Sequence, residues 1–458
     1  MVKPDSSIWA QHALTADGWQ TDVSVQVDSN GIISEVRANQ KRVGDCVGIL
    51  LPAVANLHSH AFQRAMAGLT ESRGPDPKDT FWSWRKLMYS FLQKLTPNDV
   101  ESIATFGQMQ MLEAGYASVG EFHYLHHQSD GSHYGQRAEM SERIISAANQ
   151  SGIGLTLLPV LYEQGGCDGR ALTGGQKRFG NSIDEFEKLY SDAQTMISEQ
   201  SNQFSIGVAP HSLRAVAPDS IGLAKQLAGA KPFHIHVAEQ LAEVEEIQAT
   251  LNARPVQWLL DNHDLDTTWC LIHATQMLPD ETKELARTCA TVGLCPITES
   301  NLGDGIFNGA LYDQCGGSWG IGTDSNVRIA LSEELRTLEY TQRLIEHSRA
   351  VFAHKNRSCG RVLFDAALAG GVQALQRNSG SISAGRSADL LALDVTSADF
   401  TVTKNDQWLD AWIFAGDDRL ITDVWSAGVK LVRNGTHVDR SRIVQRYQTT
   451  LTSLLAKL

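Results

Sequence analysis

Short apolar runs alternate with amphipathic stretches through the middle of the chain, and this alternation limits the possible folds more than any other feature of the sequence. The apolar runs, each of strand length, are residues 153–160, 204–209, 233–237, 269–273, 291–295 and 319–322. The stretches with helical periodicity are residues 138–149, 183–199, 242–251, 279–288 and 332–347. Repeated strand–helix units over this length predict an α/β protein with a (β/α)8 barrel. A doubly wound open sheet is the alternative, and the absence of a Gly-x-Gly-x-x-Gly turn weakens it.

The two ends of the chain have a different pattern, with short strands separated by turns. Residues 23–27 alternate, a turn follows, and residues 32–36 resume the alternation, which predicts a β-hairpin. The tail has strand patterns at 390–393, 421–425 and 429–432, then a helix from about residue 440. Because a single hairpin is barely stable alone, we expect both ends to form one small β-sandwich domain. The predicted boundaries are 1–50 and 380–458 for this domain with its terminal helix, and 51–379 for the barrel.

The charge and the cysteines limit the partners and the compartment. The 39 basic and 52 acidic residues give a formal net charge of −13, which argues against nucleic acid or an anionic membrane surface as the main partner. The amino terminus lacks the apolar segment of a signal peptide, and no apolar run approaches the roughly 20 residues that cross a bilayer. The seven cysteines form no Cys-x-x-Cys pair. We therefore expect a cytoplasmic protein with free thiols.

Polar side chains stand where several of the apolar runs end. They are His58 and His60, His236 with Glu239, His273, and Asp324. In a barrel the carboxyl ends of the strands share one face, so these residues would converge there. Each has a simpler reading, because buried histidines often only satisfy core hydrogen bonds, and the two carboxylates could cap or stabilise helix ends. Histidines and carboxylates at four independent strand ends nevertheless predict a metal site.

The order of these residues resembles that of the amidohydrolase superfamily, and the resemblance covers essentially the whole chain. It includes residues 51–60 (LPAVANLHSH) and the tail turn 380–390 (GSISAGRSADL). The family often has Pro-Gly where this chain has Pro52 and Ala53, a departure that affects the strand backbone and not the ligands. The resemblance implies a metal-dependent hydrolase.

The resemblance also bears on the number of metal ions. Two-metal members usually carry a carboxylated lysine or a carboxylate at the end of the fourth strand, and here that strand ends in residues 208–214 (VAPHSLR) without a lysine. The spacing of His236 and Glu239 is similar to that in one-metal deaminases. The implied ligands of one divalent ion are His58, His60, His236 and Asp324. Such nitrogen-rich ligation suits zinc best, with iron as the alternative.

Together these parts imply a hydrolytic deamination. A bound divalent ion lowers the pKa of water toward ~7 and makes hydroxide available. Asp324 is expected to accept the proton of that water, and Glu239 to protonate the imine nitrogen of the substrate. His273 is expected to orient the water and stabilise the tetrahedral intermediate. The predicted catalytic residues are therefore Glu239, His273 and Asp324.

Longer blocks resemble the superfamily members that convert N-formimidoyl-L-glutamate to N-formyl-L-glutamate and ammonia in histidine degradation. The blocks are residues 56–68 (NLHSHAFQRAMAG), 81–85 (FWSWR), 121–124 (EFHY), 211–216 (HSLRAV) and 301–307 (NLGDGIF). That substrate carries two carboxylates, which arginine binds bidentately. The resemblance implies Arg85 and Arg214 for the carboxylates, helped by Gln63, Tyr124 and His211. From the residues alone, Arg85 could equally lie on a helix surface, and Arg214 could pair with an acid in a loop.

Other functions stay open at this point. A nucleobase or other cyclic-amidine deaminase would keep the metal site without needing a pair of arginines. An arginase-like enzyme that releases formamide would need two manganese ions and Asp-rich motifs such as Asp-x-His-x-Asp, and the sequence has none. A non-catalytic binding module would have lost ligands, whereas all those expected are present. Because related enzymes are often dimers, the resemblance also implies a homodimer that acts on a small dicarboxylate.

Overall fold

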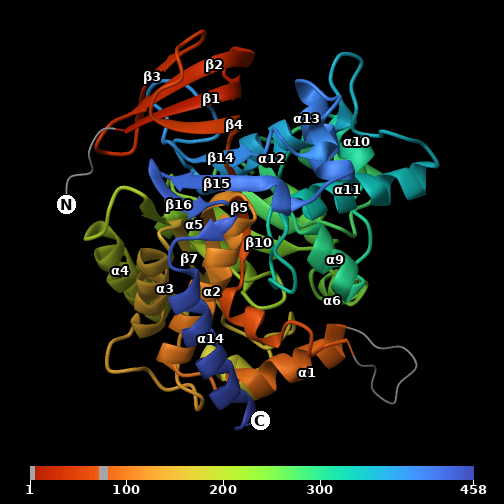
Figure 1. Cartoon of the computed structure of the whole chain (residues 1–458). Helices are drawn as coiled ribbons and strands as arrows, with labels where there is room; N and C mark the ends of the chain where they lie inside the picture. Colours follow the sequence, from red (N-terminus) through yellow and green to blue (C-terminus); the bar gives the residue numbers. More distant parts are fainter. Residues whose placement is uncertain (1–5, 72–80, 458) are drawn as a thin grey trace.

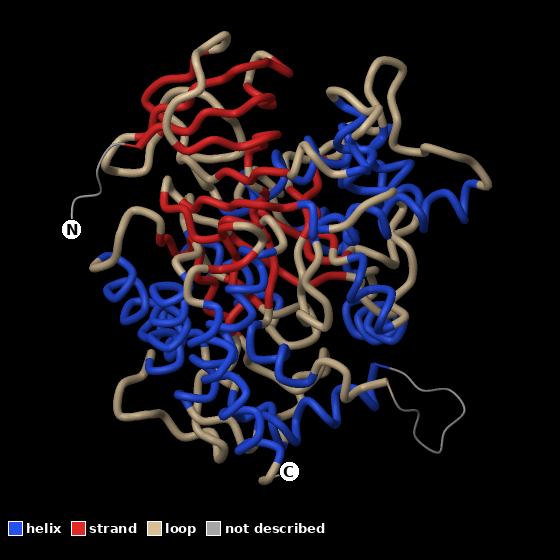
Figure 2. The backbone as a smooth tube through the Cα atoms, in the orientation of Figure 1, coloured by secondary structure: helices blue, strands red, loops and turns tan. Residues whose placement is uncertain are grey.

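The computed structural model describes residues 6–71 and 81–457 of the chain, apart from the side chains of Phe81, Trp82, Ser83, Arg85 and Lys86. Strands occupy the centre of the molecule with helices around them, and a further group of strands from the amino-terminal end lies at one edge (Figures 1 and 2). Within these ranges, no helix is long and apolar enough to cross a membrane.

Strands from both ends of the chain form one sheet. In sheet order they are β17 (Thr436–His437), β16 (Val429–Arg433), β15 (Ile421–Ser426), β14 (Leu390–Leu393), β4 (Asp45–Pro52), β1 (Ser6–Thr15), β2 (Gly18–Val27) and β3 (Ile33–Arg37). The two ends meet at the antiparallel pair of β4 and β14, where Leu50 lies opposite Ala392. In Figure 1 the red amino-terminal strands stand next to these blue carboxyl-terminal strands.

The sheet curls until its β3 edge returns to the segment before β14. Ile33 exchanges backbone hydrogen bonds of 2.8 Å with Gly385 and Arg386. At Gly31, where φ is +80°, an added Cβ would lie only 2.1 Å from the carbonyl oxygen of Ala427, so the close approach requires glycine. Apolar side chains of β1 to β4, β14 and β15 fill the enclosed core. The predicted small β-sandwich built from both chain ends is confirmed.

The central strands pair in parallel and close into a barrel. They are β5 (Val54–Ser59), β6 (Tyr116–His123), β7 (Gly154–Leu161), β8 (Phe204–Ile206) with β9 (Ala209–Pro210), β10 (Phe233–Val237), β11 (Trp269–His273), β12 (Thr291–Leu294) and β13 (Ser318–Ile321). One half runs from β5 to β9 and the other from β10 to β13. Parallel bridges of Ser59 with Asp324 and of Val208 with Phe233 join the halves on either side. The predicted (β/α)8 barrel is therefore confirmed.

Helices surround these strands, and most begin with signals that are visible in the sequence. They are α1 (Phe81–Leu92), α2 (Pro97–Glu113), α3 (Glu139–Ser151), α4 (Ile183–Ser198), α5 (Pro218–Ala228), α6 (Leu241–Leu251), α7 (Pro255–Asn262), α8 (Pro279–Ala286), α9 (Pro296–Leu302), α10 (Gly309–Gln314), α11 (Leu331–Glu346), α12 (Cys359–Leu375), α13 (Asp406–Phe414) and α14 (Arg440–Leu455), with the 3-10 turns η1 (Ala61–Met66), η2 (Gly174–Arg178), η3 (Ala398–Phe400) and η4 (Asp418–Leu420). Proline begins α2, α5, α7, α8 and α9, where its fixed φ favours helix initiation. A capping box of Ser182 and Glu185 begins α4.

The end of α12 closes the barrel opposite its carboxyl-terminal face. Ala374 and Leu375 pack inside with Leu57 and Ile272, and an added Cβ on Gly370 would lie 1.9 Å from the carbonyl oxygen of Trp319. With that end filled, the open end is the one where β5, β10, β11 and β13 terminate. The chain positions predicted for the metal site lie there, while the domain boundaries predicted at residues 50 and 380 stay a prediction.

Candidate active site

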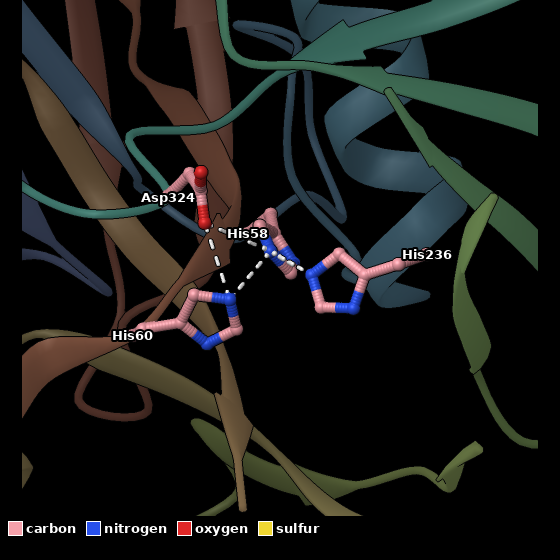
Figure 3. A group of neighbouring side chains, drawn as sticks. All are labelled: His58, His60, His236 and Asp324. Atoms are coloured by element: carbon pink, nitrogen blue, oxygen red, sulfur yellow. Dashed lines mark hydrogen bonds and ion pairs between the residues drawn. The ribbon is translucent and has the colours of Figure 1, made fainter. Parts of the chain in front are cut away.

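Four side chains from three strand ends meet at the open face of the barrel (Figure 3). His58 and His60 come from the end of β5, His236 from β10 and Asp324 from just beyond β13. The Nε2 atom of His58 lies 3.2 Å from Nε2 of His60 and 3.1 Å from Nε2 of His236. The Oδ1 atom of Asp324 lies 3.1 Å from Nε2 of His60 and 3.4 Å from Nε2 of His58. We call these buried residues the His/Asp cluster.

Hydrogen bonds outside the cluster determine which ring nitrogens carry protons. The Nδ1 atom of His60 lies 3.0 Å from the carbonyl oxygen of Phe122, and that of His236 lies 3.0 Å from the carbonyl oxygen of His211. Because a carbonyl only accepts, both Nδ1 atoms must donate, and a neutral ring held in this way turns its Nε2 lone pair inward. Lone pairs and a carboxylate oxygen at such short distances repel one another unless a cation lies between them.

The cluster fits a divalent cation in distance and in protonation. Ligands about 2.0–2.1 Å from one tetrahedral ion lie roughly 3.3 Å from each other, close to the 3.1–3.4 Å contacts observed. Burial lowers the pKa of His58 to about 3 and that of His236 well below its ordinary value. Both rings are therefore neutral at pH 7, which is the form that binds metal.

A network of hydrogen bonds between buried amides and hydroxyls connects the ends of β5 and β13 next to the cluster. Asn56 donates from Nδ2 to Oγ1 of Thr323 over 2.7 Å and accepts the Thr323 backbone N–H at its Oδ1 over 3.1 Å. Asn326 accepts from Thr323 and donates to Oγ of Ser59. These residues place His58, His60 and Asp324 relative to each other, although the sequence did not single them out.

Glu239 and His273 lie together beside the cluster. Nε2 of His273 is 3.9 Å from Oε1 of Glu239, and the His273 ring stacks on His236 at 5.6 Å between centroids. Burial raises the pKa of Glu239, so its carboxyl can hold a proton nearer neutral pH than an exposed one. Burial alone would lower the pKa of His273, but Glu239 and the neighbouring carboxylates raise it to about 10.

The backbone at these strand ends adopts the left-handed region, which is rare for residues other than glycine. The φ angle is +50° at Ala238, +71° at His273, +51° at Ala274 and +43° at Asp324. Such conformations cost about 1–3 kcal/mol each and persist where the surrounding structure enforces them, often at functional sites. Here they turn each chain sharply after its strand and aim the polar side chains at one point.

A cavity lies beside the cluster, and nearly all of the predicted site residues line it. Those that line it are His60, Gln63, Tyr124, His211, Arg214, His236, Glu239, His273 and Asp324. Arg85 belongs to α1, but its side chain lies outside the described residues. The apolar part of the wall includes Met88, Phe179 and Leu302, which sequence reasoning missed because nothing in their type marks a pocket.

The cavity contains a buried cation and a buried amide with unused hydrogen-bonding atoms. Within the described part of the chain, Nε of Arg214 and Oε1 of Gln63 are buried without a hydrogen-bond partner. Burial would lower the pKa of Arg214, but Glu243, Tyr162 and other acidic groups raise it, so the guanidinium is charged. Gln63 also donates to the hydroxyl of Tyr124 over 2.7 Å. A ligand with an anionic acceptor would satisfy the guanidinium.

Comparison with known proteins agrees with this geometry. Residues 49–431 match the Amidohydrolase family, and the chain belongs to that family of metal-dependent hydrolases. Ahead of that match, residues 5–45 match a separate model, described as the N-terminal domain of formimidoylglutamate deiminase HutF. The family predicted from the strand-end residues is thus confirmed.

Individual relatives cover nearly the whole chain. A formimidoylglutamate deiminase of Pseudomonas aeruginosa is 44% identical over 456 residues, which is 98% of this chain and 100% of that protein. The crystal structure of an amidohydrolase from Brucella melitensis is also 44% identical, with a TM-score of 0.93 over 98% of this chain and 100% of that one. The zinc-bound structure of an adenosine deaminase from Xanthomonas campestris, at 20% identity and a TM-score of 0.81 over 98% of each chain, shares the fold.

Proposed function

We propose that this chain hydrolyses N-formimidoyl-L-glutamate to N-formyl-L-glutamate and ammonia, as a step of histidine degradation. The observation that carries the proposal is one cavity that combines the buried His/Asp cluster with the buried, unpaired Nε of Arg214. The cluster suits the activation of water, and the guanidinium suits a substrate carboxylate. The full-length similarity to a formimidoylglutamate deiminase supports the same reaction.

We infer that the cluster holds one divalent ion, zinc in preference to iron. Three imidazole nitrogens and one carboxylate oxygen are donors that zinc prefers, and they would come from His58, His60, His236 and Asp324. When bound, the ion would supply the Lewis acidity that makes water nucleophilic at neutral pH.

The remaining chemistry is proton transfer by the chain itself. Water adds to the formimidoyl carbon, the C–NH2 bond then breaks, and the carbon keeps the oxygen as a formyl group. Asp324 accepts one proton of the attacking water while Glu239 protonates the imine nitrogen. As the C–N bond breaks, Asp324 passes its proton to that nitrogen, which leaves as ammonia, and the remaining hydroxyl proton returns to Glu239. Glu239 suits this task because burial raises its pKa. His273, 3.9 Å from Glu239, orients the water and stabilises the developing negative charge.

Substrate selection would come from the other end of the cavity. Arg214 binds one carboxylate, and Gln63, Tyr124 and His211 add hydrogen bonds along the same wall. Arg85 is proposed for the second carboxylate from the sequence alone. A cyclic-amidine deaminase is the alternative function, and it would have no use for the buried charge of Arg214.

The test is product analysis with purified, metal-loaded enzyme. N-formimidoyl-L-glutamate should yield ammonia and N-formylglutamate in equal amounts, detected by a coupled assay and by mass spectrometry, and Glu239→Gln should lower the rate of formation of both about 10²- to 10³-fold. Glutamate with formamide would overturn the reaction. Turnover of cyclic amidines such as aminopurines, with none of the linear substrate, would overturn the substrate and favour the alternative.

The family resemblance also leads us to propose a cytoplasmic homodimer. Light scattering of the purified chain at micromolar concentration would test it, with twice the 50.1 kDa chain mass as the expected result.

A further inference from the structure

Glu299 makes a contact with His273 that the proposed reaction has not used. It lies in the first turn of α9, directly after β12, and is buried. Its Oε1 is 3.1 Å from Nδ1 of His273 and accepts the backbone N–H of Cys295 over 2.9 Å. The carboxylate therefore connects the start of α9 to the side of His273 that faces away from the cavity.

This contact determines which nitrogen of His273 faces the reaction. Glu299 Oε1 already takes the Cys295 N–H and acts there as an acceptor, so Nδ1 of His273 is the donor in their contact. The other nitrogen, Nε2, is then the one directed at Glu239, 3.9 Å away. Fixing one ring nitrogen by a hydrogen bond sets the role of the other.

The backbone alone would not hold the ring in place. His273 has a φ of +71° and is followed by Ala274 at +51°, so the chain turns just where the ring leaves the strand. The ring of His236 stacks at 15° on one face, but stacking permits a 180° flip of the His273 ring that would put Cδ2 in the place of Nδ1 and Cε1 in the place of Nε2. The hydrogen bond from Nδ1 to Glu299 is the contact that excludes the flipped ring.

We propose that Glu299 is a positioning residue: it holds His273 with a proton on Nδ1 and with Nε2 directed at the reacting carbon. Within the described residues, the Glu299 side chain bonds to His273 and to the Cys295 backbone, and Glu299 neither lines the cavity nor belongs to the His/Asp cluster. The proposal rests on the proposed function for the role of His273, but not for the geometry of the pair.

The chain offers a matched control in Glu334 on α11. Glu334 is also buried, and its Oε2 accepts the backbone N–H of Ile297 over 2.8 Å. Both carboxylates therefore cap the start of α9, but only Glu299 bonds to His273. A merely structural role in capping would be disturbed equally by Glu299→Leu and Glu334→Leu.

Steady-state kinetics separates the two roles. Glu299→Leu should lower kcat about 10²-fold with KM changed less than about 3-fold, because the loss falls on the transition state. Glu299→Gln keeps an accepting oxygen and should recover kcat to within about 10-fold of the wild type. Glu334→Leu should keep kcat within about 3-fold, and metal content should be equal in all variants. An equal loss of kcat in the two Leu variants would overturn the proposal.

A second measurement needs neither substrate nor turnover. In the 15N-histidine-labelled metal-loaded enzyme, the His273 ring should show a protonated Nδ1, assigned by its absence in His273→Gln. Glu299→Gln, which keeps the shape of the side chain, should shift that proton resonance upfield because a neutral amide is a weaker acceptor than a carboxylate. An unshifted resonance would overturn the proposal. Wild-type enzyme inactive on formimidoylglutamate would instead overturn the proposed function and leave this measurement valid.

Discussion

Two neighbouring clusters at the open end of the barrel contain similar side chains, but only one of them calls for a cation. The first is the His/Asp cluster of His58, His60, His236 and Asp324, and the second, which we call the His/Cys/Glu cluster, is His273, Cys295 and Glu299. Both are buried, and in both the possible ligand atoms lie within 4.8 Å of one another. Residue type and burial therefore do not distinguish a metal site from a proton-holding site.

The difference lies in where the protons are. In the His/Asp cluster, the carbonyl oxygens of Phe122 and His211 hold the Nδ1 protons of His60 and His236, so acceptors face acceptors at the centre. In the His/Cys/Glu cluster, Glu299 accepts two hydrogen bonds, one from Nδ1 of His273 and one from the backbone N–H of Cys295, so each contact contains a donor and an acceptor. The first arrangement is incomplete without a cation, and the second is complete as it stands.

The opposite pKa shifts of the histidines follow from the same difference. Burial lowers the pKa of His236, whose Nδ1 faces a backbone carbonyl, well below its ordinary value, whereas carboxylates overcome burial at His273 and raise its pKa to about 10. The lesson is that the partner of the second ring nitrogen, a carbonyl or a carboxylate, decides whether a buried histidine ligates or carries a proton.

The largest effect should come from removing a ligand of the His/Asp cluster. His236→Ala should reduce bound metal to a small fraction of the wild-type amount, measured by plasma mass spectrometry. It should lower kcat/KM by about 10³-fold or more, the equivalent of roughly 4 kcal/mol of lost transition-state stabilisation. His234→Ala is a suitable control, because His234 is buried on the same strand and bonds to the carbonyl of Ala374. Full metal content in His236→Ala would contradict the assignment of the His/Asp cluster as the metal site.

The next largest effect should come from Glu239, which belongs to neither cluster. Glu239→Gln should lower kcat about 10²- to 10³-fold, because the amide keeps the shape but cannot deliver the proton. Metal content should be unchanged, since no ligand is lost. A parallel loss of metal would mean that the His/Asp cluster extends to this carboxylate, and the division between ligation and proton transfer would fail.

Arg214 should affect binding more than turnover. Arg214→Gln should raise KM for N-formimidoyl-L-glutamate about 10- to 100-fold, since a hydrogen bond to a charged group contributes about 1.5–3 kcal/mol. kcat and metal content should change little. Arg336→Gln is the control, because Arg336 bonds to the backbone carbonyls of Ile413 and Gly416 and does not line the cavity. A collapse of kcat with unchanged KM would contradict the carboxylate-binding role.

Much of this arrangement could be predicted from the sequence. The strand–helix alternation predicted the barrel, and apolar runs ending in His60, His236, His273 and Asp324 predicted which side chains share its face, because strand direction alone brings such ends together. The role of Glu299 could not be predicted in this way. Its only signal is a carboxylate in the first turn after a strand, the same signal that Glu239 gives.

The sequence also could not predict which of the two clusters binds the metal ion. It depends on the carbonyl oxygens of Phe122 and His211, and a backbone carbonyl is present at every residue. Only the register of β6 and β9 against their neighbours decides which carbonyl reaches a ring nitrogen.

The smallest effect is expected at Cys295, and it tests whether the His/Cys/Glu cluster also binds a metal ion. If the His/Cys/Glu cluster held a metal, its thiol would have to ionise, because the thiolate is the ligand. Burial and the surrounding carboxylates raise the pKa of Cys295 well above its ordinary value, so the thiol stays protonated. Cys295→Ala should therefore leave metal content unchanged and kcat/KM within about 3-fold, while the small cavity lowers the free energy of unfolding by about 1 kcal/mol.

Metal analysis, kinetics and denaturant unfolding of Cys295→Ala beside Cys289→Ala, whose thiol is exposed, would check this. A fall in metal content confined to Cys295→Ala would show that the His/Cys/Glu cluster ligates after all. The proton on Nδ1 of His273 would then be displaced by a metal ion, and Glu299 would be a ligand in place of a positioning residue.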